Sequence, residues 1–445
     1  MLTKSKISLA FIAFMYVYIV FNISYWQDRI TVNWDPSGYY LYLPAAFIYH
    51  DVGKLQFYPG ITQKYSLNNH DISYGIYAQP EGMKLNKYPV GTGLFELPFF
   101  LVAHWYCISL ANTPHAIDGY SFPYMESVIL AGVFWVIAGL YVLRRFLRRY
   151  FSEGATAVTL LLIAFGTNLY FYTVFNTGMS HPFSFALFCF LLSATDNWYR
   201  NEKKTNAILI GLLLGLIIIV RPTNAVVALL PLCWIYTGTF VDRLRFYKRQ
   251  FPTIVTAFIV FVSVLMLQLS YWKYVTGHWV YFSYQEEGFD FGSPEIWKGL
   301  FSYRKGWFVY TPVAFFGVLG LVLLAKKHKR LAALISVYLA VNIYIVFSWH
   351  QWSYGGSFGA RPLIEAMAIV AIPLAILIEW LFSRNKIAIT IGASFVFVFL
   401  MALNTFQSYQ LTNSLTAWDF TNRAFYWRTF GKLKVTDEDR KLLNK

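Results

Sequence analysis

The chain has 445 residues, of which 57% are hydrophobic and 13% are charged, and its formal net charge is +15. Soluble domains carry roughly one-quarter charged residues, so this composition excludes an ordinary soluble protein and indicates an integral membrane protein. The positive charge does not indicate nucleic-acid binding, because the basic residues gather in short clusters between apolar runs, as in loops on the cytoplasmic side of a membrane.

The first apolar run begins after Lys4 and Lys6 and ends at Tyr25. A cleaved signal peptide has a shorter apolar region, of about 7–15 residues, and a cleavage site of small residues. Here the run ends in a Tyr-Trp pair that is typical of a membrane interface. We therefore favour an uncleaved first span over a signal peptide.

The basic clusters predict the membrane topology, because such clusters are expected to face the cytoplasm. They lie at 144–149, 200–204, 243–249, 326–330 and 384–386. Apolar runs near the ~20 residues needed to cross a bilayer satisfy every cluster at 7–25, 124–143, 155–173, 180–196, 206–221, 223–240, 252–273, 307–325, 331–349, 363–382 and 386–405. The sequence thus predicts an all-α polytopic membrane protein with about eleven transmembrane helices and a cytoplasmic N-terminus.

Residues 1–405 would form one transmembrane domain, followed by a short external tail at 406–445. The apolar stretch from Val90 to Ala111 must not cross the membrane in this arrangement, since a crossing there would invert every later loop. Glu96 near its start suits a re-entrant or interfacial helix that packs on protein.

Three external regions, 26–123, 274–306 and 350–362, then share one side of the membrane, and function is expected there. In the first of them, Tyr39 to His50 is predicted to form an amphipathic helix along the membrane plane. A polar stretch from Lys54 to Lys87 is long enough to be a substrate-facing loop.

Asp35 follows the first span closely and lies between Trp34, which can anchor at the interface, and Pro36, which fixes the backbone. Its carboxylate would be held just above the bilayer, as a general base should be. The alternative is a helix cap, because Asp-Pro-Ser-Gly is also a good helix start. Spacing alone leaves both interpretations open.

Candidate anion-binding cations occur in the other two external regions. Arg361 follows a segment rich in glycine and aromatic residues that begins at Trp352, and its guanidinium would suit a phosphate. A snorkelling interface arginine is the alternative. The same two interpretations, a phosphate-binding cation or a snorkelling cation, apply to Arg304 and Lys305, and their predicted external position favours anion binding.

Arg221 turns the chain between two predicted spans and should face an interface or a polar cavity, since a charge at mid-membrane costs about 2.5–3.5 kcal/mol. His181 opens a span on the same side and is either a packed polar residue or a ligand. The histidines and carboxylates form only loose pairs, so neither a divalent metal nor another cofactor is predicted. Nucleotide-binding glycine motifs are absent from the sequence.

Several short motifs recur along the chain in a characteristic order. They are Asp35 with Tyr39 and Tyr40, Lys87-Tyr88-Pro89-Val90-Gly91, Ser180-His181-Pro182, Arg221-Pro222-Thr223-Asn224, Ser302-Tyr303-Arg304-Lys305-Gly306-Trp307 with Thr311-Pro312, and Gly355-Gly356-Ser357-Phe358-Gly359-Ala360-Arg361. Together they resemble the GT-C superfamily of polytopic membrane glycosyltransferases, in particular the branch with protein mannosyltransferases, the lipid A aminoarabinose transferase and Rgt-like bacterial enzymes.

The resemblance implies an inverting transferase of the bacterial inner membrane with a periplasm-facing site and Asp35 as catalytic base. It implies a polyprenyl-phosphate sugar donor and a periplasmic glycan, lipid or protein acceptor. Arg304, Lys305 and Arg361 would bind the phosphate of the donor. The candidates for other substrate contacts are Tyr39, Tyr40, Lys87, Tyr88, His181, Arg221 and Trp352.

Two features depart from this family pattern. The turn from Asn176 to His181 lacks the second acidic residue that some relatives carry, and Glu365 follows Arg361 closely enough to pair with it. The rival hypothesis is a flippase or transporter of lipid-linked sugars, which should show repeated halves and ionisable residues at mid-bilayer. This sequence concentrates its polar groups in external loops, which favours the transferase.

Overall fold

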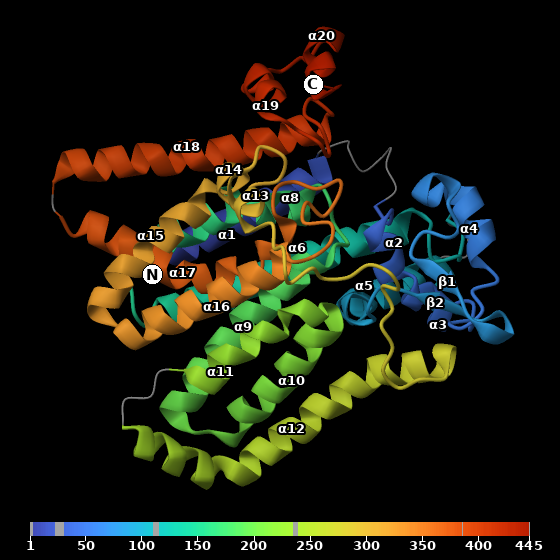
Figure 1. The fold of residues 1–445 in the computed structure, drawn as a ribbon, viewed down its shortest axis with the longest axis horizontal. Coiled ribbons are helices and arrows are strands. Elements are labelled where there is room, and N and C mark those ends of the chain that lie inside the picture. Colours follow the sequence, from blue (N-terminus) through green and yellow to red (C-terminus); the bar gives the residue numbers. More distant parts are fainter. Residues whose placement is uncertain (1–2, 23–30, 110–114, 235–238, 385, 445) are drawn as a thin grey trace.

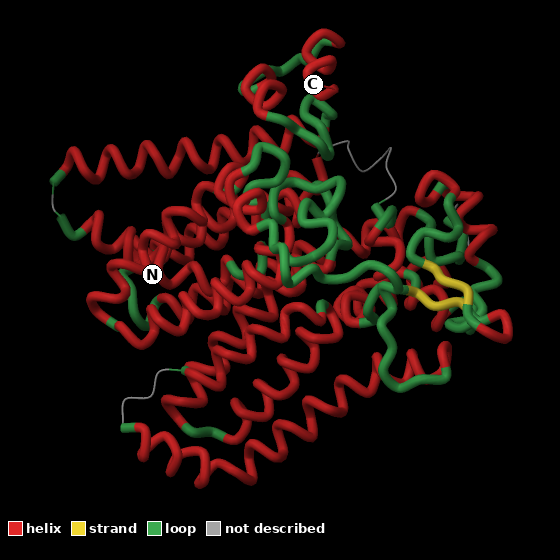
Figure 2. Tube along the Cα trace, viewed as in Figure 1, coloured by secondary structure: helices red, strands yellow, loops and turns green. Residues whose placement is uncertain are grey.

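The computed structural model describes residues 3–22, 31–109, 115–234, 239–384 and 386–444, and this part of the chain is almost entirely helical (Figures 1 and 2). The longer helices are α1 (Lys4–Asn22), α5 (Gly91–Ser109), α6 (Phe122–Leu147), α7 (Glu153–Phe165), α9 (Ser180–Asn201), α10 (Lys204–Val220), α12 (Phe240–Thr276), α15 (Pro312–Lys327), α16 (Lys329–Phe347), α17 (Met367–Phe382) and α18 (Ile387–Thr412). The helical fold class is confirmed.

Shorter elements connect these helices. They are α2 (Asp35–Tyr40), α3 (Tyr42–Phe47), α4 (Tyr58–Tyr65), α8 (Leu169–Val174), α11 (Leu229–Cys233), α13 (Ile296–Phe301), α14 (Trp307–Tyr310), α19 (Arg423–Thr429) and α20 (Asp437–Arg440), with the 3-10 turns η2 (Leu67–His70), η3 (Pro80–Gly82), η4 (Pro222–Ala228), η5 (Arg361–Leu363) and η6 (Lys441–Asn444). Strands β1 (Ile76–Ala78) and β2 (Lys84–Asn86) pair as an antiparallel hairpin.

Within the described residues, five helices are long and apolar enough to cross a membrane by length and composition. They are Lys4–Asn22, Phe122–Leu147, Val241–Thr276, Lys329–Phe347 and Ile387–Thr412. Several other apolar helices, such as α7, α10 and α17, have 17 residues or fewer and fall short of the ~20 residues that a full crossing needs. The structure is therefore that of a helical membrane protein, and the number of eleven crossings stays a prediction.

Three predicted spans are interrupted in the structure, and the one at 307–325 is divided into α14 and α15, with Pro312 as the first residue of the second helix. The span at 155–173 is divided into α7 and α8, because the helix stops at Gly166. The span at 223–240 begins as the 3-10 turn η4 and continues only as α11, since Pro222 and the polar Thr223-Asn224 pair favour a turn over an α-helix. Residues 235–238 of that span lie outside the described residues.

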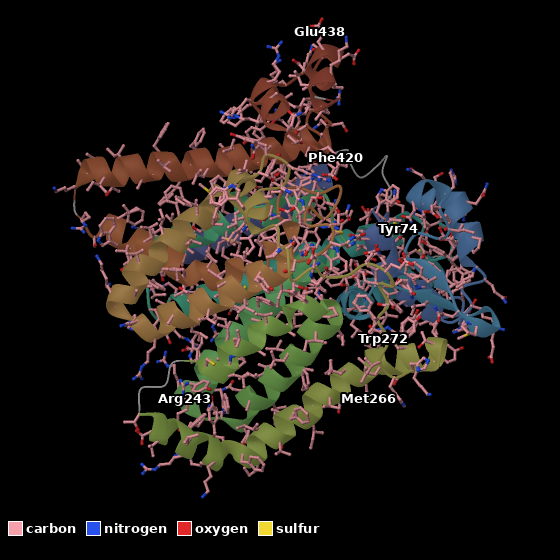
Figure 3. The ribbon with its side chains drawn as sticks, in the orientation of Figure 1. Tyr74, Arg243, Met266, Trp272, Phe420 and Glu438 are labelled. Carbon is pink, nitrogen blue, oxygen red and sulfur yellow. The ribbon has the colours of Figure 1, made fainter. Side chains whose placement is uncertain are left out.

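The helices bring the predicted cytoplasmic loops to one end of the molecule. Figure 1 shows the starts of α1 and α12 and the α15–α16 turn at one end, and α2 to α5 with the hairpin at the other. Arg243, from a predicted cytoplasmic cluster, and Tyr74, from the first external region, lie at these opposite ends in Figure 3. Segments predicted to be cytoplasmic and segments predicted to be external thus lie at opposite ends of the fold.

The first external region has a hydrophobic core of its own, separate from the core of the helix bundle. Within it, the predicted amphipathic helix from Tyr39 to His50 is wrong: α2 and α3 are separate, and residues 39–45 are buried. Pro44 explains the break, because it has no N–H to donate to the carbonyl of Tyr40. The stretch from Val90 forms α5 up to Ser109, and residues 110 and 111 lie outside the described part.

Candidate active site

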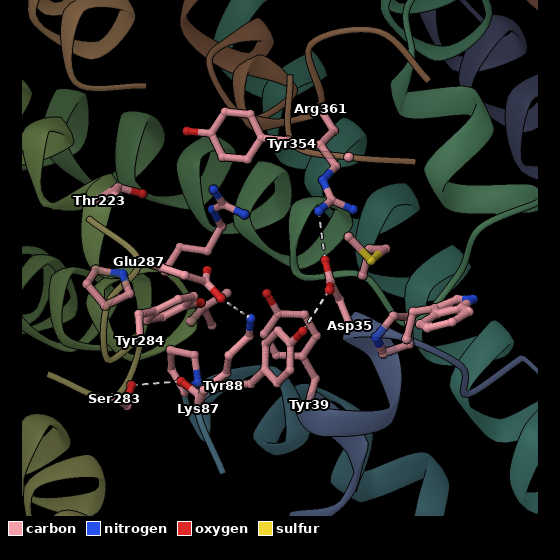
Figure 4. Close-up of a pocket in the computed structure, with 18 of the residues that line it drawn as sticks. Asp35, Tyr39, Lys87, Tyr88, Thr223, Ser283, Tyr284, Glu287, Tyr354 and Arg361 are labelled. Carbon is pink, nitrogen blue, oxygen red and sulfur yellow. Dashed lines mark hydrogen bonds and ion pairs between the residues drawn. The ribbon is translucent and has the colours of Figure 1, made fainter. Parts of the chain in front are cut away.

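A cavity of about 1180 Å³ lies where the external regions of the sequence meet (Figure 4). Its charged lining consists of Asp35, Lys87, Arg221, Glu287 and Arg361. Its aromatic lining includes Trp34, Tyr39, Tyr74, Tyr88, Trp272, Tyr284, Trp349, Tyr354 and Trp418. The lining residues lie in segments that the basic clusters predict to be external, or at the external ends of predicted spans.

A pair of asparagines holds the turn that carries Asp35. The side-chain oxygen of Asn33 accepts from the backbone N–H of Asn68 at 2.6 Å, and the side-chain oxygen of Asn68 accepts from the backbone N–H of Trp34 at 2.5 Å. Trp34 has φ 58°, in the left-handed region that non-glycine residues rarely adopt. The polypeptide therefore enters α2 by a tightly held turn.

The carboxylate of Asp35 points into the cavity, where three side chains donate to it (Figure 4). The phenols of Tyr74 and Tyr88 donate to Oδ1 at 2.8 Å and 2.7 Å, and Nη2 of Arg361 donates to Oδ2 at 2.7 Å. Helix α2 receives no side-chain cap. The helix-cap interpretation of Asp35 is therefore wrong.

Electrostatics keep Asp35 ionised. Burial alone would raise its pKa, but the Arg361 guanidinium and the hydrogen bonds from Tyr88 and Tyr74 outweigh burial and lower the pKa of Asp35 from 3.8 to about 2. Because this pKa lies far below neutral, the group is a carboxylate at physiological pH and can accept a proton.

Arg361 begins the 3-10 turn η5, directly after a glycine-rich loop. Gly359 in this loop has φ 58°, and a Cβ atom there would meet Cβ of Tyr310 at 2.8 Å. Only glycine fits that position without displacement, so the loop can press against the bundle and present Arg361 to the cavity. The side chains of Arg361 and Asp35 remain 16% and 17% exposed, which keeps the pair accessible from the cavity.

Lys87 and Tyr88 enter the cavity from the segment after β2. Nζ of Lys87 lies 2.8 Å from Oε1 of Glu287 and 5.3 Å from the ring centre of Tyr88. A Cβ atom at position 38 would meet the Tyr88 ring at 2.0 Å, so Gly38 makes room for that ring beside α2. Tyr39 lines the cavity next to Tyr88, with ring centres 4.9 Å apart.

Arg221 lines the cavity and is backed by two buried residues. Its Nε lies 3.4 Å from Oε1 of Glu365, and Nδ1 of His181 lies 3.2 Å from Oε2 of the same carboxylate. Glu365 thus pairs with Arg221 and His181, and the expected pairing with Arg361 is wrong. His181 is fully buried and supports the wall of the cavity from behind.

The structure places five candidate residues away from the cavity lining: His181, behind the wall, and Tyr40, Arg304, Lys305 and Trp352. Tyr40 donates to the carbonyl of Gly119 inside the external core. Arg304 pairs with Asp419 through Nε and Nη2, at 2.8 Å and 2.9 Å. Buried Lys305 donates to the backbone carbonyls of Ser357 and Trp418.

These contacts correct the expected phosphate-binding role of Arg304 and Lys305. Both cations already bind acceptors within this protein. The contacts of Lys305 also connect the C-terminal segment to the loop before Arg361. Trp352 lies beside Arg304, with its ring centre 5.6 Å from that guanidinium, and belongs to the same supporting layer.

Tyr74, Glu287 and Tyr284 were missed by sequence reasoning. Tyr74 and Tyr284 are two of 33 tyrosines, so neither residue type nor spacing marks them. Glu287 lies beside Glu286 in an external loop, and this acidic pair was the one signal that would have drawn attention to the second carboxylate of the cavity.

The cavity combines a base, cations and aromatic surfaces. Among the described residues, no group of three or more histidine, cysteine or acidic side chains is placed to hold a metal ion. A scan against protein-family models and a search of curated proteins find no match to this chain. The geometry of the cavity itself must therefore support any assignment of function.

Proposed function

We propose that this protein is a membrane glycosyltransferase of the GT-C type that moves a sugar from a polyprenyl-phosphate donor to an external acceptor, with Asp35 as general base. One observation carries the proposal: an ionised carboxylate faces a large aromatic cavity and has a guanidinium 2.7 Å away. A base for the acceptor hydroxyl and a cation for the departing phosphate are thus adjacent.

The chemistry needs little more than this pair. A lipid phosphate is a good leaving group, so the reaction requires no second carboxyl group as general acid, unlike a glycosidase with its pair of acids. Asp35 takes the proton of the acceptor hydroxyl as that oxygen attacks the anomeric carbon, and general-base catalysis of this kind contributes about 10²–10⁴-fold. A single displacement inverts the anomeric centre.

The remaining lining residues suit both substrates. Arg361, with Lys87 and Arg221 on the same cavity, supplies positive charge for the phosphate that departs. The aromatic side chains offer flat apolar surfaces for sugar rings and for the first prenyl units. The charge polarity of the fold supports a cavity on the outer face, which in a bacterial inner membrane is the periplasmic face.

The test measures release of lipid phosphate and sugar transfer by purified full-length protein supplied with candidate polyprenyl-phosphate sugars. The wild type should convert donor, and Asp35→Asn should lower kcat by about 10²–10⁴-fold. Asp118→Asn is a matched control, because Asp118 also accepts from a tyrosine and pairs with a lysine but lies outside the cavity lining. Equal rates for wild type and Asp35→Asn would exclude Asp35 as base.

A wild type that converts no donor, yet moves lipid-linked sugar across the bilayer of sealed vesicles, would establish transport in place of transfer. The vesicle assay therefore runs beside the transfer assay.

A further inference from the structure

In the structure, the proposed base and the proposed phosphate-binding cation bind each other. Nη2 of Arg361 donates to Oδ2 of Asp35, so this oxygen is a weak acceptor for a substrate hydroxyl. The same N–H cannot be given to a phosphate at full strength. A change of partners would free this oxygen for a substrate hydroxyl and this N–H for a phosphate.

The two oxygens of Asp35 are held in different ways. Oδ1 accepts from the phenols of Tyr74 and Tyr88, whereas Oδ2, among the described residues, accepts from Arg361 alone. If Arg361 moves away, the two phenols still orient and stabilise the carboxylate. Oδ2 is then free, while Asp35 stays in position.

Arg304 shows how an arginine with a purely structural role is held in this protein. It binds both oxygens of Asp419 and lies over the ring of Phe420, 4.2 Å from its centre. This pair is bidentate and stacked, so two donors of Arg304 and both oxygens of Asp419 are already used within the protein. Arg361 makes a single hydrogen bond to Asp35 within the described part of the chain, which leaves most of its five N–H donors for another anion.

We propose that Arg361 is exchanged between Asp35 and the phosphate of the sugar donor, so that donor binding itself releases the base. This inference rests on the proposed function. With the donor bound, the proton of the acceptor hydroxyl moves to Oδ2, and the acceptor oxygen bonds to the anomeric carbon. The bond from that carbon to the phosphate oxygen breaks, and the electron pair leaves on the phosphate that Arg361 holds.

The exchange predicts that a variant without catalytic activity binds polyprenyl phosphate more tightly than wild type. Asp35→Asn removes the charge that competes for Arg361, so a polyprenyl phosphate without sugar should bind more tightly than to wild type. The expected decrease in Kd is about three- to tenfold, because the cation no longer spends most of its time paired. Asp35→Asn combined with Arg361→Gln should lose this gain.

The measurement is equilibrium binding of decaprenyl phosphate to the purified full chain in detergent. Asp419→Asn is the matched control, since it releases Arg304 in the same manner outside the cavity, and its Kd should equal that of wild type. Asp35→Ala provides the same test if the asparagine variant does not fold. An unchanged or higher Kd in both Asp35 variants overturns the exchange.

This outcome is separate from failure of the proposed function. If wild type transfers sugar and Asp35→Asn does not, but phosphate affinity stays the same, only the exchange is wrong. If wild type transfers no sugar, the function is wrong whatever the affinity.

Discussion

The two phenols on Asp35 allow its role as a base to be tested through pH dependence. The fall in the pKa of Asp35 from 3.8 to about 2 corresponds to about 2 kcal/mol, since one pKa unit is worth 1.36 kcal/mol. Hydrogen bonds to a charged group are worth about 1.5–3 kcal/mol, so loss of both phenols removes a stabilisation as large as the whole shift. The double variant Tyr74→Phe, Tyr88→Phe should therefore bring the pKa of Asp35 to about 4 or above.

The assay is release of lipid phosphate between about pH 4 and pH 8. A base is active when ionised, and at donor concentrations below KM the rate follows kcat/KM, which reports the free enzyme. Activity is therefore lost as the pH falls through the pKa that Asp35 has while it is still paired with Arg361. Wild type should show a flat profile across this range, and the double variant should lose activity toward its acid end. Tyr40→Phe, which removes a phenol that binds the Gly119 carbonyl, should keep the wild-type profile. Identical profiles for wild type and the double variant would refute the reasoning.

Two further predictions concern the frame of the cavity. Gly38→Ala should lower kcat at least about tenfold, because the new Cβ displaces the Tyr88 ring from Asp35. The overpacking should also destabilise the protein by about 1–3 kcal/mol and lower its melting temperature. Unchanged turnover would show that this ring position is not needed. Arg304→Ala should lower the melting temperature by several degrees, consistent with a loss of about 1–2 kcal/mol in the free energy of unfolding. It should leave the KM for donor unchanged. A large rise in KM would show that Arg304 binds the phosphate after all.

Sequence reasoning located the helices better than the breaks within them. Apolar runs predicted the helical class, because twenty-residue apolar stretches have few alternatives to helix in lipid. The break at Gly166 lies in a tight contact with Val313 of another helix, which no local pattern predicts, whereas Pro222 and the polar residues after it carried a local turn signal within the apolar run. Helix length therefore could not be taken from hydrophobicity alone.

The sequence allowed a correct choice of cavity residues where a charged residue is isolated among apolar segments. It misled where the charged residue has an ion-pair partner far away in the chain. Asp35 and Arg361 stand out because a carboxylate and a guanidinium are rare beside apolar segments. Arg304 looked equivalent to Arg361, because its partner Asp419 is 115 residues away and nothing local predicts that pair. The sequence thus indicates which charges need partners, and only the fold decides whether the partner is the protein itself or a substrate.

The backbone around Asp35 favours a functional explanation of this site. Trp34, Asn68, Asn69 and His70 all have positive φ, and such conformations in residues other than glycine cost about 1 kcal/mol or more each. Their joint effect is to bring Asn68 against the turn before Asp35, where it binds Asn33 and Trp34. A helix start needs no such frame, since Asp-Pro-Ser-Gly forms one readily. Positive φ at four positions beside one carboxylate supports its proposed role as a base, which needs a fixed position, more than a capping role, which does not.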